Sequence, residues 1–418
     1  MIDRVGEERR SLWRSQPFLR FWTGNAVSTF GDQITSLALP FIAVTELRAT
    51  PFQVGVLTAA LWGPNLLAVL IGTWADAVRQ KKSLLVLANI LQAAALAVVP
   101  VAFVTGTLSI PLLYVAAVAL GFGGVLFDSA YPAFFVRLVR RDQYVSANSA
   151  LSTTRGMSAI GGPAVGGVLI QLLGAPLAIL ADAVSFLFSS IAIASVRTPP
   201  KPQEKASREP YHHRLRLGLS YLRQHRILRA SLFASATMNI ASIAIQALLV
   251  LYATRYLDLD AGQIGLALGI GAAGGLLGAP TAGPLAVRIG TGPAIAIGTA
   301  LSALPFIALP VAGGTQLSPF FALSAAEFVS SWAIMVFDVN NNSLRSAVTD
   351  DDMRSRVAGA YSTLNYGVRP VGAFLAGIAA TAAGPGLVIG AAAVLGGAAV
   401  SWVLTSPILR VRRIEELD

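Results

Sequence analysis

The sequence lacks cysteine, has only three histidines and carries few charges. Without cysteine the chain forms no disulfide framework, thiolate nucleophile or cysteine-based metal site. His212, His213 and His225 lie in one charged stretch, which excludes a histidine-based catalytic or zinc site in the apolar part of the chain. Charged residues make up 12% of the 418 residues, against about 25% in soluble proteins. This is too little charge to cover a soluble chain of this length, so a soluble globular protein is excluded.

Apolar residues dominate what is present. The AVILMFWYC set makes up 55% of the chain, which also excludes a disordered protein. A membrane-spanning helix needs about 20 apolar residues. Twelve such stretches are predicted, at residues 18–44, 52–75, 83–104, 110–136, 146–173, 176–195, 228–253, 262–287, 292–312, 317–342, 357–383 and 386–408. The sequence therefore predicts an all-α membrane protein with twelve transmembrane helices.

The basic residues predict how the chain is oriented in the membrane. With a cytoplasmic N-terminus, 27 of the 31 basic residues fall in inside segments and only Arg48 and Arg255 in outside loops. Because basic residues concentrate in cytoplasmic loops, we expect both termini to be cytoplasmic. The net charge of +10 then reflects loops beside an anionic leaflet rather than nucleic-acid binding. Only four basic residues are lysine, a bias typical of GC-rich bacterial genomes, so we expect a bacterial cytoplasmic (inner) membrane.

A hydrophilic stretch at 197–227 divides the chain into two bundles of six spans, 1–196 and 228–418. Pro199 and Pro200 end any helix that leaves the sixth span, so the first part of this cytoplasmic linker is expected to be flexible. Residues 214–229 alternate leucines with basic residues and predict an interfacial helix with its apolar side against the membrane. A solvated charge run is the alternative.

The two halves resemble each other at a constant offset of 210 residues. The matches are Gln53 with Gln263, Gly55 with Gly265, Phe127 and Asp128 with Phe337 and Asp338, Asp142 with Asp352, Ser152 and Thr153 with Ser362 and Thr363, and Gly162 and Gly167 with Gly372 and Gly377. One offset places every match at the same span number in each half. Two parallel six-helix repeats joined by a basic loop are typical of a rocking transporter.

Three motifs carry a resemblance to a known family. They are GTWADAVRQKK at 72–82, GPAVGG at 162–167 and DDMRSRVAGAYS at 351–362. With the twelve spans and the 6+6 repeat, they resemble the major facilitator superfamily (MFS), in particular its macrolide and enterobactin exporter branch. The resemblance implies the MFS fold, alternating access around a midplane site, and a protein without a cofactor that works as a monomer.

The chain also departs from the family pattern. Trp74, Ala77 and Arg79 replace the Leu, Arg and second Gly of the loop signature, and Val287 stands where the second half would carry Asp. Ala117 occupies the position of an arginine found in many proton-driven drug exporters. A proton-coupling scheme that depends on that arginine therefore does not transfer to this chain.

Polar residues inside the spans are the candidate site residues, because a charge at the bilayer centre costs roughly 2.5–3.5 kcal/mol. In the first span Asn25, Ser28, Thr29, Asp32 and Ser36 share one helical face. The resemblance implies that spans 1, 4, 7 and 10 line the central cavity. The candidates for substrate binding or proton coupling are Asp32, Asn25, Asp128, Asn239, Gln246, Glu327, Asp338, Asn341, Arg155 and Arg369.

Asp32, near the middle of its span, is the first candidate for a proton-carrying or cation-recognising carboxylate, with a structural hydrogen-bonding role as the alternative. Proton coupling requires a group that is neutral in one state and charged in another. Glu327 is a further cavity candidate. Asp128 and Asp338 occupy matched repeat positions, which favours a structural role inherited by both halves. Asp182, near the outer end of span 6, is expected to be structural.

Arg155 and Arg369 lie within spans 5 and 11, where each needs a carboxylate or carbonyl partner. A pair with Asp32 or Asp128 that is released on protonation is one interpretation. The other is that each arginine extends to the nearby cytoplasmic interface. Both stay open.

The resemblance also implies a conformational latch, in which the aspartate of the loop after span 2 meets the start of span 11 and basic loop residues. An anion near a helix N-terminus and charged hydrogen bonds are both stabilising. The predicted latch residues are Gly72, Asp76, Arg79, Arg137, Arg354 and Arg356.

Small residues predict close helix packing in spans 5 and 8. The helix-packing candidates are Gly162, Pro163, Gly166 and Gly167 in span 5, with Gly271, Gly274 and Gly278 in span 8. Such stripes let helices approach closely. In the resembling fold these two spans face each other across the halves, where they would slide; tight packing without sliding is the alternative.

The resulting functional hypothesis is a secondary active transporter for proton-coupled efflux of an amphipathic organic compound, such as an antibiotic, another drug or a siderophore. Proton-coupled uptake of a metabolite and lipid or lysolipid flipping remain alternatives. An enzyme is disfavoured because the spans contain no histidine or cysteine, and no phosphate-binding loop of the ATPase type is present. The expected partners are a small-molecule substrate, protons and membrane lipid, with no nucleic acid and no metal. A non-transporting sensor or scaffold also stays open.

Overall fold

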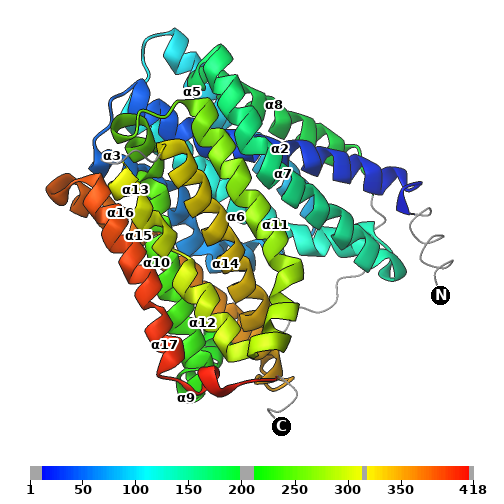
Figure 1. Cartoon of the computed structure of the whole chain (residues 1–418). Helices are drawn as coiled ribbons and strands as arrows, with labels where there is room; N and C mark the ends of the chain where they lie inside the picture. The colour runs from blue at the N-terminus through cyan, green and yellow to red at the C-terminus, as the bar shows by residue number, and fades with distance from the viewer. Residues whose placement is uncertain (1–11, 198–210, 313–317, 414–418) are drawn as a thin grey trace. The chain divides into compact units, whose positions relative to one another are not determined.

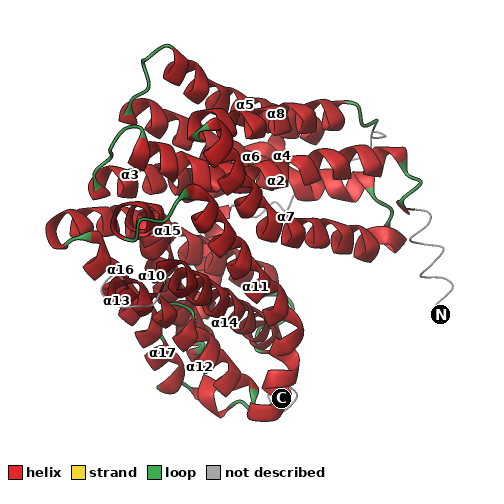
Figure 2. Ribbon diagram, turned by 45° about the horizontal axis from the view of Figure 1, so that its top comes forward, coloured by secondary structure: helices red, strands yellow, loops and turns green. Residues whose placement is uncertain are grey.

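The computed structural model describes residues 12–197, 211–312 and 318–413, and within these ranges the chain is helical and contains no strand (Figure 1 and Figure 2). It forms two compact units, residues 1–47 with 60–208 and residues 48–59 with 209–418. The first unit contains α2 (Gln16–Thr45), η1 (Gly63–Leu67), α4 (Ala68–Ala77), α5 (Lys81–Val104), α6 (Ile110–Leu138), η2 (Arg141–Gln143), α7 (Tyr144–Leu173) and α8 (Ala175–Ala194). Helix α3 (Pro51–Trp62) crosses from the second unit into the first.

The second unit contains α9 (Tyr211–Gln224), α10 (Arg226–Tyr256), α11 (Ala261–Ile289), α12 (Thr291–Leu301), η3 (Leu304–Ile307), α13 (Ala308–Ala312), α14 (Pro319–Ala347), α15 (Arg354–Ala383), α16 (Pro385–Ala398), α17 (Val400–Leu404) and η4 (Pro407–Arg410). In the described part of the chain, eleven helical segments are long and apolar enough to cross a membrane. Helix α15, the eleventh span in chain order, is the one that remains. Its 30 residues suffice for a crossing, but Asn365 and Arg369 lower its hydropathy. The predicted all-α fold with twelve spans is confirmed.

The repeat predicted from sequence reappears in the helix boundaries. Helices α2, α3, α5, α7 and α8 begin 210 residues before α10, α11, α12, α15 and α16, respectively. Even an unusual backbone conformation is repeated, since Arg48 and Asp258 have φ angles of 50° and 52°. The two halves therefore share one backbone design.

Capping explains one of the matched sequence pairs. Gln53 accepts a hydrogen bond from the backbone N–H of Thr50 at 2.8 Å, and the backbone N–H of Gln53 donates to the Thr50 hydroxyl at 3.3 Å. Asp260 and Gln263 make the same reciprocal pair at 3.1 and 2.8 Å. Each pair is a capping box that satisfies two backbone donors at the start of a helix. The matched glutamines thus begin α3 and α11.

Two glycines at matched positions each form a one-residue connection between long helices. Gly174 alone joins α7 to α8, and Gly384 alone joins α15 to α16. Their φ angles are 79° and 87°, in the region that side chains with a Cβ rarely adopt. These turns reverse the chain within one residue in both halves.

The glycine stripes pack against helices of their own unit. A Cβ on Gly162 would meet Gln33 of α2, and a Cβ on Gly166 would lie 3.1 Å from the Cα of Ile34. In the second unit, Gly271 lies against Glu327 of α14 in the same way. The buried small residues therefore hold α7 to α2 and α11 to α14. The predicted contact between spans 5 and 8 stays a prediction.

Residues 48–59 are grouped with the second unit, although the sequence analysis placed all of 1–196 in the first bundle. The reason is a close backbone contact. A Cβ on Gly55 of α3 would lie 2.6 Å from the Cα of Gly377 in α15, and Phe52 packs edge-on against Phe374 with ring centroids 5.8 Å apart. Span 2 is interrupted farther along by the 3₁₀ stretch η1, which contains Pro64.

The interfacial helix predicted at 214–229 is two helices, because α9 ends at Gln224 and α10 begins at Arg226. Leu215, Leu219 and Leu222 of α9 pack against a cluster that includes Val357 and Tyr361 of α15. These leucines therefore contact protein, whereas the sequence analysis expected them to contact lipid. Residues 198–210, the first part of the predicted linker, lie outside the described residues.

His225 forms the junction between α9 and α10. Its Nδ1 accepts a hydrogen bond from the backbone N–H of Leu228 at 3.5 Å, and its ring stacks on Tyr221. Burial lowers the pKa of His225, which favours the neutral imidazole that can accept this bond. The Tyr221 hydroxyl bonds Asp350 at 3.1 Å and so ties α9 to the segment before α15.

Candidate functional site

The first unit contains a partly open cavity of about 500 Å³, lined by α2, α5, α6, α7, α8, the end of α3 and η1. Its size suits a drug-sized ligand. The lining residues are Asn25, Ser28, Thr29, Asp32, Thr35, Ser36, Leu39, Pro40, Leu61, Trp62, Asn65, Asn89, Gln92, Leu120, Gly121, Gly124, Val125, Phe127, Asp128, Arg155 and Phe186. All of them belong to the first unit. The predicted polar face of span 1 therefore points into a real cavity.

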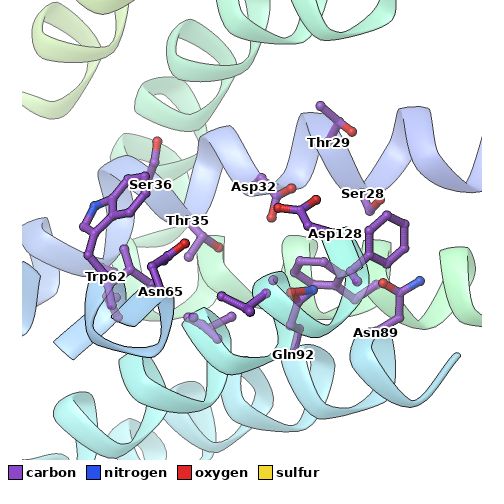
Figure 3. A pocket seen from close by; sticks show the side chains of 18 of the residues that line it. Ser28, Thr29, Asp32, Thr35, Ser36, Trp62, Asn65, Asn89, Gln92 and Asp128 are labelled. Atoms are coloured by element: carbon purple, nitrogen blue, oxygen red, sulfur yellow. The ribbon is translucent and has the colours of Figure 1, made fainter. Parts of the chain in front are cut away.

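Two carboxyl groups lie in the middle of this cavity wall. Asp32 of α2 and Asp128 of α6 are both exposed, and their carboxyl groups interact electrostatically. Figure 3 shows their side chains directed to the same part of the cavity. Arg155 of α7 lines the same cavity and acts electrostatically on Asp128. The cavity thus carries two acidic groups and one basic group, an excess of negative charge.

Arg155 does not form the ion pair that one interpretation of the sequence required. Among the described residues it has no salt bridge to Asp32 or Asp128 within 4.0 Å. Since it lines the cavity, its charge offsets part of the acidic potential without neutralising one particular carboxyl group. A cationic ligand could therefore approach either aspartate directly.

Amide side chains extend the polar wall. Asn25 donates to the Thr29 hydroxyl at 3.5 Å, and Asn89 donates to the Ser189 hydroxyl of α8 at 2.9 Å. Gln92, one turn after Asn89, lies against Gly123 of α6, where a Cβ would collide with it. These groups supply hydrogen-bond donors and acceptors to a bound molecule at fixed positions.

Aromatic and aliphatic side chains complete the cavity. Trp62 and Asn65 lie near Ser36, at the opposite end of the view in Figure 3 from Asn89. Phe127 and Phe186 also line the cavity. Flat aromatic faces attract organic cations as well as apolar groups. The wall therefore combines apolar surface with a few oriented polar groups, as ligand pockets commonly do.

Sequence reasoning missed several lining residues, among them Thr35, Trp62, Asn65, Asn89 and Gln92. A signal was available for two of them. Asn89 and Gln92 are amides spaced three residues apart in the otherwise apolar stretch 83–104, which places them on one helical face. Trp62 and Asn65 could not be predicted in this way, because they reach the cavity where span 2 leaves α3 for η1.

In the second unit the predicted residues form a hydrogen-bonded seam instead of lining the described cavity. Arg369 Nε donates to Asn239 Oδ1 at 2.7 Å, and Asn239 Nδ2 donates to Asn365 Oδ1 at 3.0 Å. Ser235 also donates to Asn365 Oδ1, at 2.8 Å. The Arg369 guanidinium lies 4.6 Å from the ring centroid of Tyr366.

The seam continues one turn away. Ser231 donates to Asn341 Oδ1 at 2.6 Å, and Asn341 Nδ2 donates to the Tyr361 hydroxyl at 3.1 Å. Ser231, Ser235 and Asn239 are spaced by four residues on α10, as are Tyr361, Asn365 and Arg369 on α15. We call these six residues, with Asn341, the polar seam. It satisfies buried polar groups between α10 and its neighbours.

Three further predicted residues lie outside both groups. Gln246 of α10 and Asp338 of α14 are exposed, and Glu327 of α14 is half-buried against Gly271. Asp338 interacts electrostatically with Arg345 and Arg369. None of the three lines the 500 Å³ cavity. Their candidate roles stay predictions.

The predicted latch residues contact near neighbours in sequence. Asp76 pairs with Lys81, Oδ1 to Nζ, at 3.8 Å, and Lys81 donates to the carbonyl oxygens of Ala75 and Asp76. Lys81 thereby caps the end of α4, a role that the sequence analysis did not assign. Arg354 pairs with Asp351 at 2.8 Å.

The other latch candidates are placed as follows. Gly72 of α4 lies near Ser129 of α6, since a Cβ built on Gly72 would be 3.7 Å from the Ser129 hydroxyl oxygen. Arg79 is exposed, and Arg137 of α6 is half-buried near Lys81. Arg356 Nη1 lies 3.6 Å from the sulfur of Met353. The latch itself stays a prediction.

Metal ligands are not gathered in the described residues. In that part of the chain, no group of three or more His, Asp or Glu side chains could hold a metal ion.

Comparison with known proteins is consistent along the whole chain. The sequence model of the transmembrane secretion effector family matches residues 11–418. The multidrug efflux pump Tap of Mycobacterium bovis and of Mycobacterium tuberculosis is 27% identical over 365 residues, which cover 85% of this chain and 84% of Tap. Among solved structures, a bacterial homologue of the iron transporter ferroportin is similar with a TM-score of 0.73, 18% identity and coverage of 93% of this chain and 98% of that one. The nucleoside transporter NupG is similar with a TM-score of 0.76, 12% identity and coverage of 94% and 99%. At these identities the structures support the fold alone.

Proposed function

We propose that this chain, which belongs to the transmembrane secretion effector family of the major facilitator superfamily and is a multi-pass membrane transporter, exports amphipathic organic compounds in exchange for protons. The preferred substrates in this proposal are organic cations. The observation that carries it is the position of Asp32, an exposed carboxyl group in the wall of a cavity of about 500 Å³ that also has aromatic surface.

The chemistry of the cavity supports this substrate class. Asp32 and Asp128 outnumber the single basic group, Arg155, so a cation gains more than an anion by entering. Trp62 and Phe186 offer aromatic faces to the apolar part of the same molecule. The likeness to the multidrug efflux pump Tap favours export of such compounds.

Coupling follows from competition for one site. A carboxylate that binds an organic cation must be ionised, and a proton bound to the same oxygen atoms removes that charge. If Asp32 holds a proton in one orientation of the cavity and a cation in the other, each transport cycle exchanges the two. The proton gradient then drives the cation out by alternating access.

The orientation and the latch complete the proposal. The distribution of basic residues supports cytoplasmic termini in a bacterial inner membrane. Asp76, exposed at the end of α4, is proposed to latch the cytoplasmic side with basic residues of the second half. We further propose that the protein works as a monomer.

The first test is gradient-driven transport in proteoliposomes. An imposed pH gradient should drive accumulation or release of a fluorescent organic cation, with macrolides and siderophores tested in parallel. Asp32→Asn should reduce gradient-driven flux at least tenfold, because the side chain keeps its size but loses its charge. Asp32→Glu, which keeps the charge, should retain part of the flux, and equal amounts of folded protein in the membrane are the control.

Two outcomes contradict the proposal. Full gradient-driven flux in Asp32→Asn removes Asp32 from coupling. If the wild-type protein moves none of the compounds under an intact gradient, proton-coupled export is rejected. Metabolite uptake or lipid flipping is then favoured.

A further inference from the structure

A third carboxyl group lies directly behind the cavity wall. Asp182 of α8 is fully buried, with 0% of its surface exposed, and is not among the residues that line the cavity. Its Oδ2 accepts a hydrogen bond from the Thr35 hydroxyl, and its Oδ1 accepts one from the Ser185 hydroxyl at 2.8 Å. Both oxygen atoms of this carboxyl group are therefore used inside the protein.

The backbone of α2 makes room for this group. A Cβ built on Gly31 would fall on Asp182 Oδ1 and on the Ser185 hydroxyl. Only glycine at this position lets α2 and α8 approach closely enough for Thr35 to reach Asp182. Because this contact requires glycine on the facing helix, it fixes the position of the buried carboxyl group more closely than an ordinary helix contact does.

Thr35 connects Asp182 to the cavity. The threonine lines the cavity and at the same time donates to Asp182. Asp32 is three residues earlier on the same helical face, and its carboxyl group interacts electrostatically with that of Asp182. Asp182 thus lies one hydrogen bond away from the cavity and close to the proposed coupling group.

The charged groups around this pair are few. Asp32 comes from α2, Asp128 from α6 and Arg155 from α7, and Arg155 acts on Asp128. Helix α5 contributes Asn89, which donates to Ser189 of α8, and Gln92, which lies against Gly123 of α6; neither side chain titrates. No basic side chain of the described residues forms a salt bridge with Asp182.

Two carboxylates that lie close together in a region of low dielectric repel each other strongly, so both cannot be ionised at little cost. We propose that Asp182 is a positioning residue for coupling, and that Asp182 and Asp32 hold one proton between them. This inference rests on the proposed function and deepens it.

In this scheme Asp182 stays ionised, because both of its oxygen atoms accept hydrogen bonds, and the one proton of the pair resides on Asp32. An arriving cation displaces that proton to the solution from which the cation came, and a proton from the opposite side binds Asp32 when the cation leaves. One proton is exchanged for each cation, and Asp182 keeps its charge throughout. Asp182 therefore sets the pH at which Asp32 can exchange its proton.

The test measures binding of tetraphenylphosphonium, a permanent cation that does not titrate, to purified protein at a series of pH values without any gradient. Binding should weaken as the pH falls and Asp32 becomes protonated. Asp182→Asn removes the repelling charge, so Asp32 should stay ionised to lower pH. We expect the midpoint of the binding curve to move about one pH unit toward acid.

A matched control separates charge from packing. Ser189→Ala removes a buried hydrogen bond between α8 and Asn89 but no charge, and should leave the midpoint in place even if affinity falls. If Asp182→Asn does not fold, Thr35→Val serves instead. It is nearly isosteric and removes the hydroxyl donor that stabilises charge on Asp182, so the midpoint should move in the same direction by a smaller amount.

The outcomes are distinguishable. If the binding curve of Asp182→Asn has the same pH midpoint as that of the wild-type protein, the role of Asp182 is overturned, and proton-coupled export is not affected. The same holds for Thr35→Val where that variant is used. A wild-type protein that does not bind the cation at any pH overturns the substrate class of the proposed function, and the role of Asp182 with it.

Discussion

The two halves of the chain share a backbone design but differ in the chemistry placed on it. Five helices of the first half begin 210 residues before their counterparts, and both halves use a capping-box glutamine at the start of their second span. Apart from Asp128, which is matched by Asp338, the carboxyl groups proposed for coupling do not repeat. Asp32 corresponds to Ser242 and Asp182 to Ala392, while Glu327 corresponds to Ala117.

The difference teaches what each half contributes. The first unit gathers carboxyl groups around an open cavity, whereas the second joins serine, asparagine, tyrosine and arginine side chains in the polar seam. The repeated positions include those that begin helices or reverse the chain, together with the charged pair Asp128 and Asp338. Asp32 and Asp182 are not repeated, so under the proposed function the charge exchange would belong to the first half.

The largest effect is expected where the two halves differ in packing. Gly31 and Asp182 correspond to Ala241 and Ala392. Gly31→Ala should collide with the Asp182 carboxyl group and lower stability by about 1–3 kcal/mol, the usual cost of overpacking. The double variant Gly31→Ala with Asp182→Ala recreates the pair found in the second half and should recover thermal stability in detergent. Its coupling should not recover.

The expected difference between the halves is contradicted if Gly31→Ala is as stable as the wild-type protein. Tolerance of the Gly31→Ala substitution would mean that α2 and α8 are not held at the distance that Asp182 requires. Recovery of stability without recovery of gradient-driven flux would separate the packing role of Gly31 from the role of Asp182 in coupling.

A middle-sized effect is expected at the matched pair Arg155 and Asn365. Asn365→Ala leaves Ser235 and Asn239 without a shared acceptor, so stability should fall by about 0.5–1.5 kcal/mol. Arg155 is exposed and has no salt bridge or hydrogen bond among the described residues. Arg155→Ala should therefore change stability by less than about 0.5 kcal/mol. It should tighten cation binding, since it removes a repelling charge.

Thermal unfolding in detergent and titration with the cation measure the two quantities. Equal losses of stability in the two variants would contradict the idea that the second half alone carries a structural seam.

The smallest effect tests what the halves have in common. Gln53→Ala and Gln263→Ala each remove one side of a capping box and should each cost about 0.5–1 kcal/mol. Because the reciprocal bonds are nearly the same in both places, the two losses should be equal within error. Unequal losses measured by thermal unfolding would show that the shared backbone design is not equally stable in the two halves.

Much of the fold is predictable because span length and capping are local properties. Apolar stretches of about 20 residues predicted all twelve spans, including α15, in which Asn365 and Arg369 lower the hydropathy. The polar face of span 1 was also predictable, since helical periodicity alone places Asn25, Ser28 and Asp32 together.

The remaining features depend on which helices are neighbours. The hydrogen bonds of Asp182 could not be predicted, because nothing near it in the chain signals Thr35 or Gly31, which come from a helix almost 150 residues earlier. The stripe of Gly162 and Gly166 was recognised, but its packing partner α2 was not. The hydrogen bond between Asn239 and Asn365 was not predicted either. Periodicity identifies a face and leaves its neighbour undetermined.

The single-residue connections at Gly174 and Gly384 have a consequence for how the protein is made. Two helices joined by one residue have no polar loop that could cross the bilayer separately from them. We therefore expect α7 with α8, and likewise α15 with α16, to enter the lipid as pairs. We expect a larger residue at either turn to reduce the amount of protein that inserts into the membrane, before transport activity is affected.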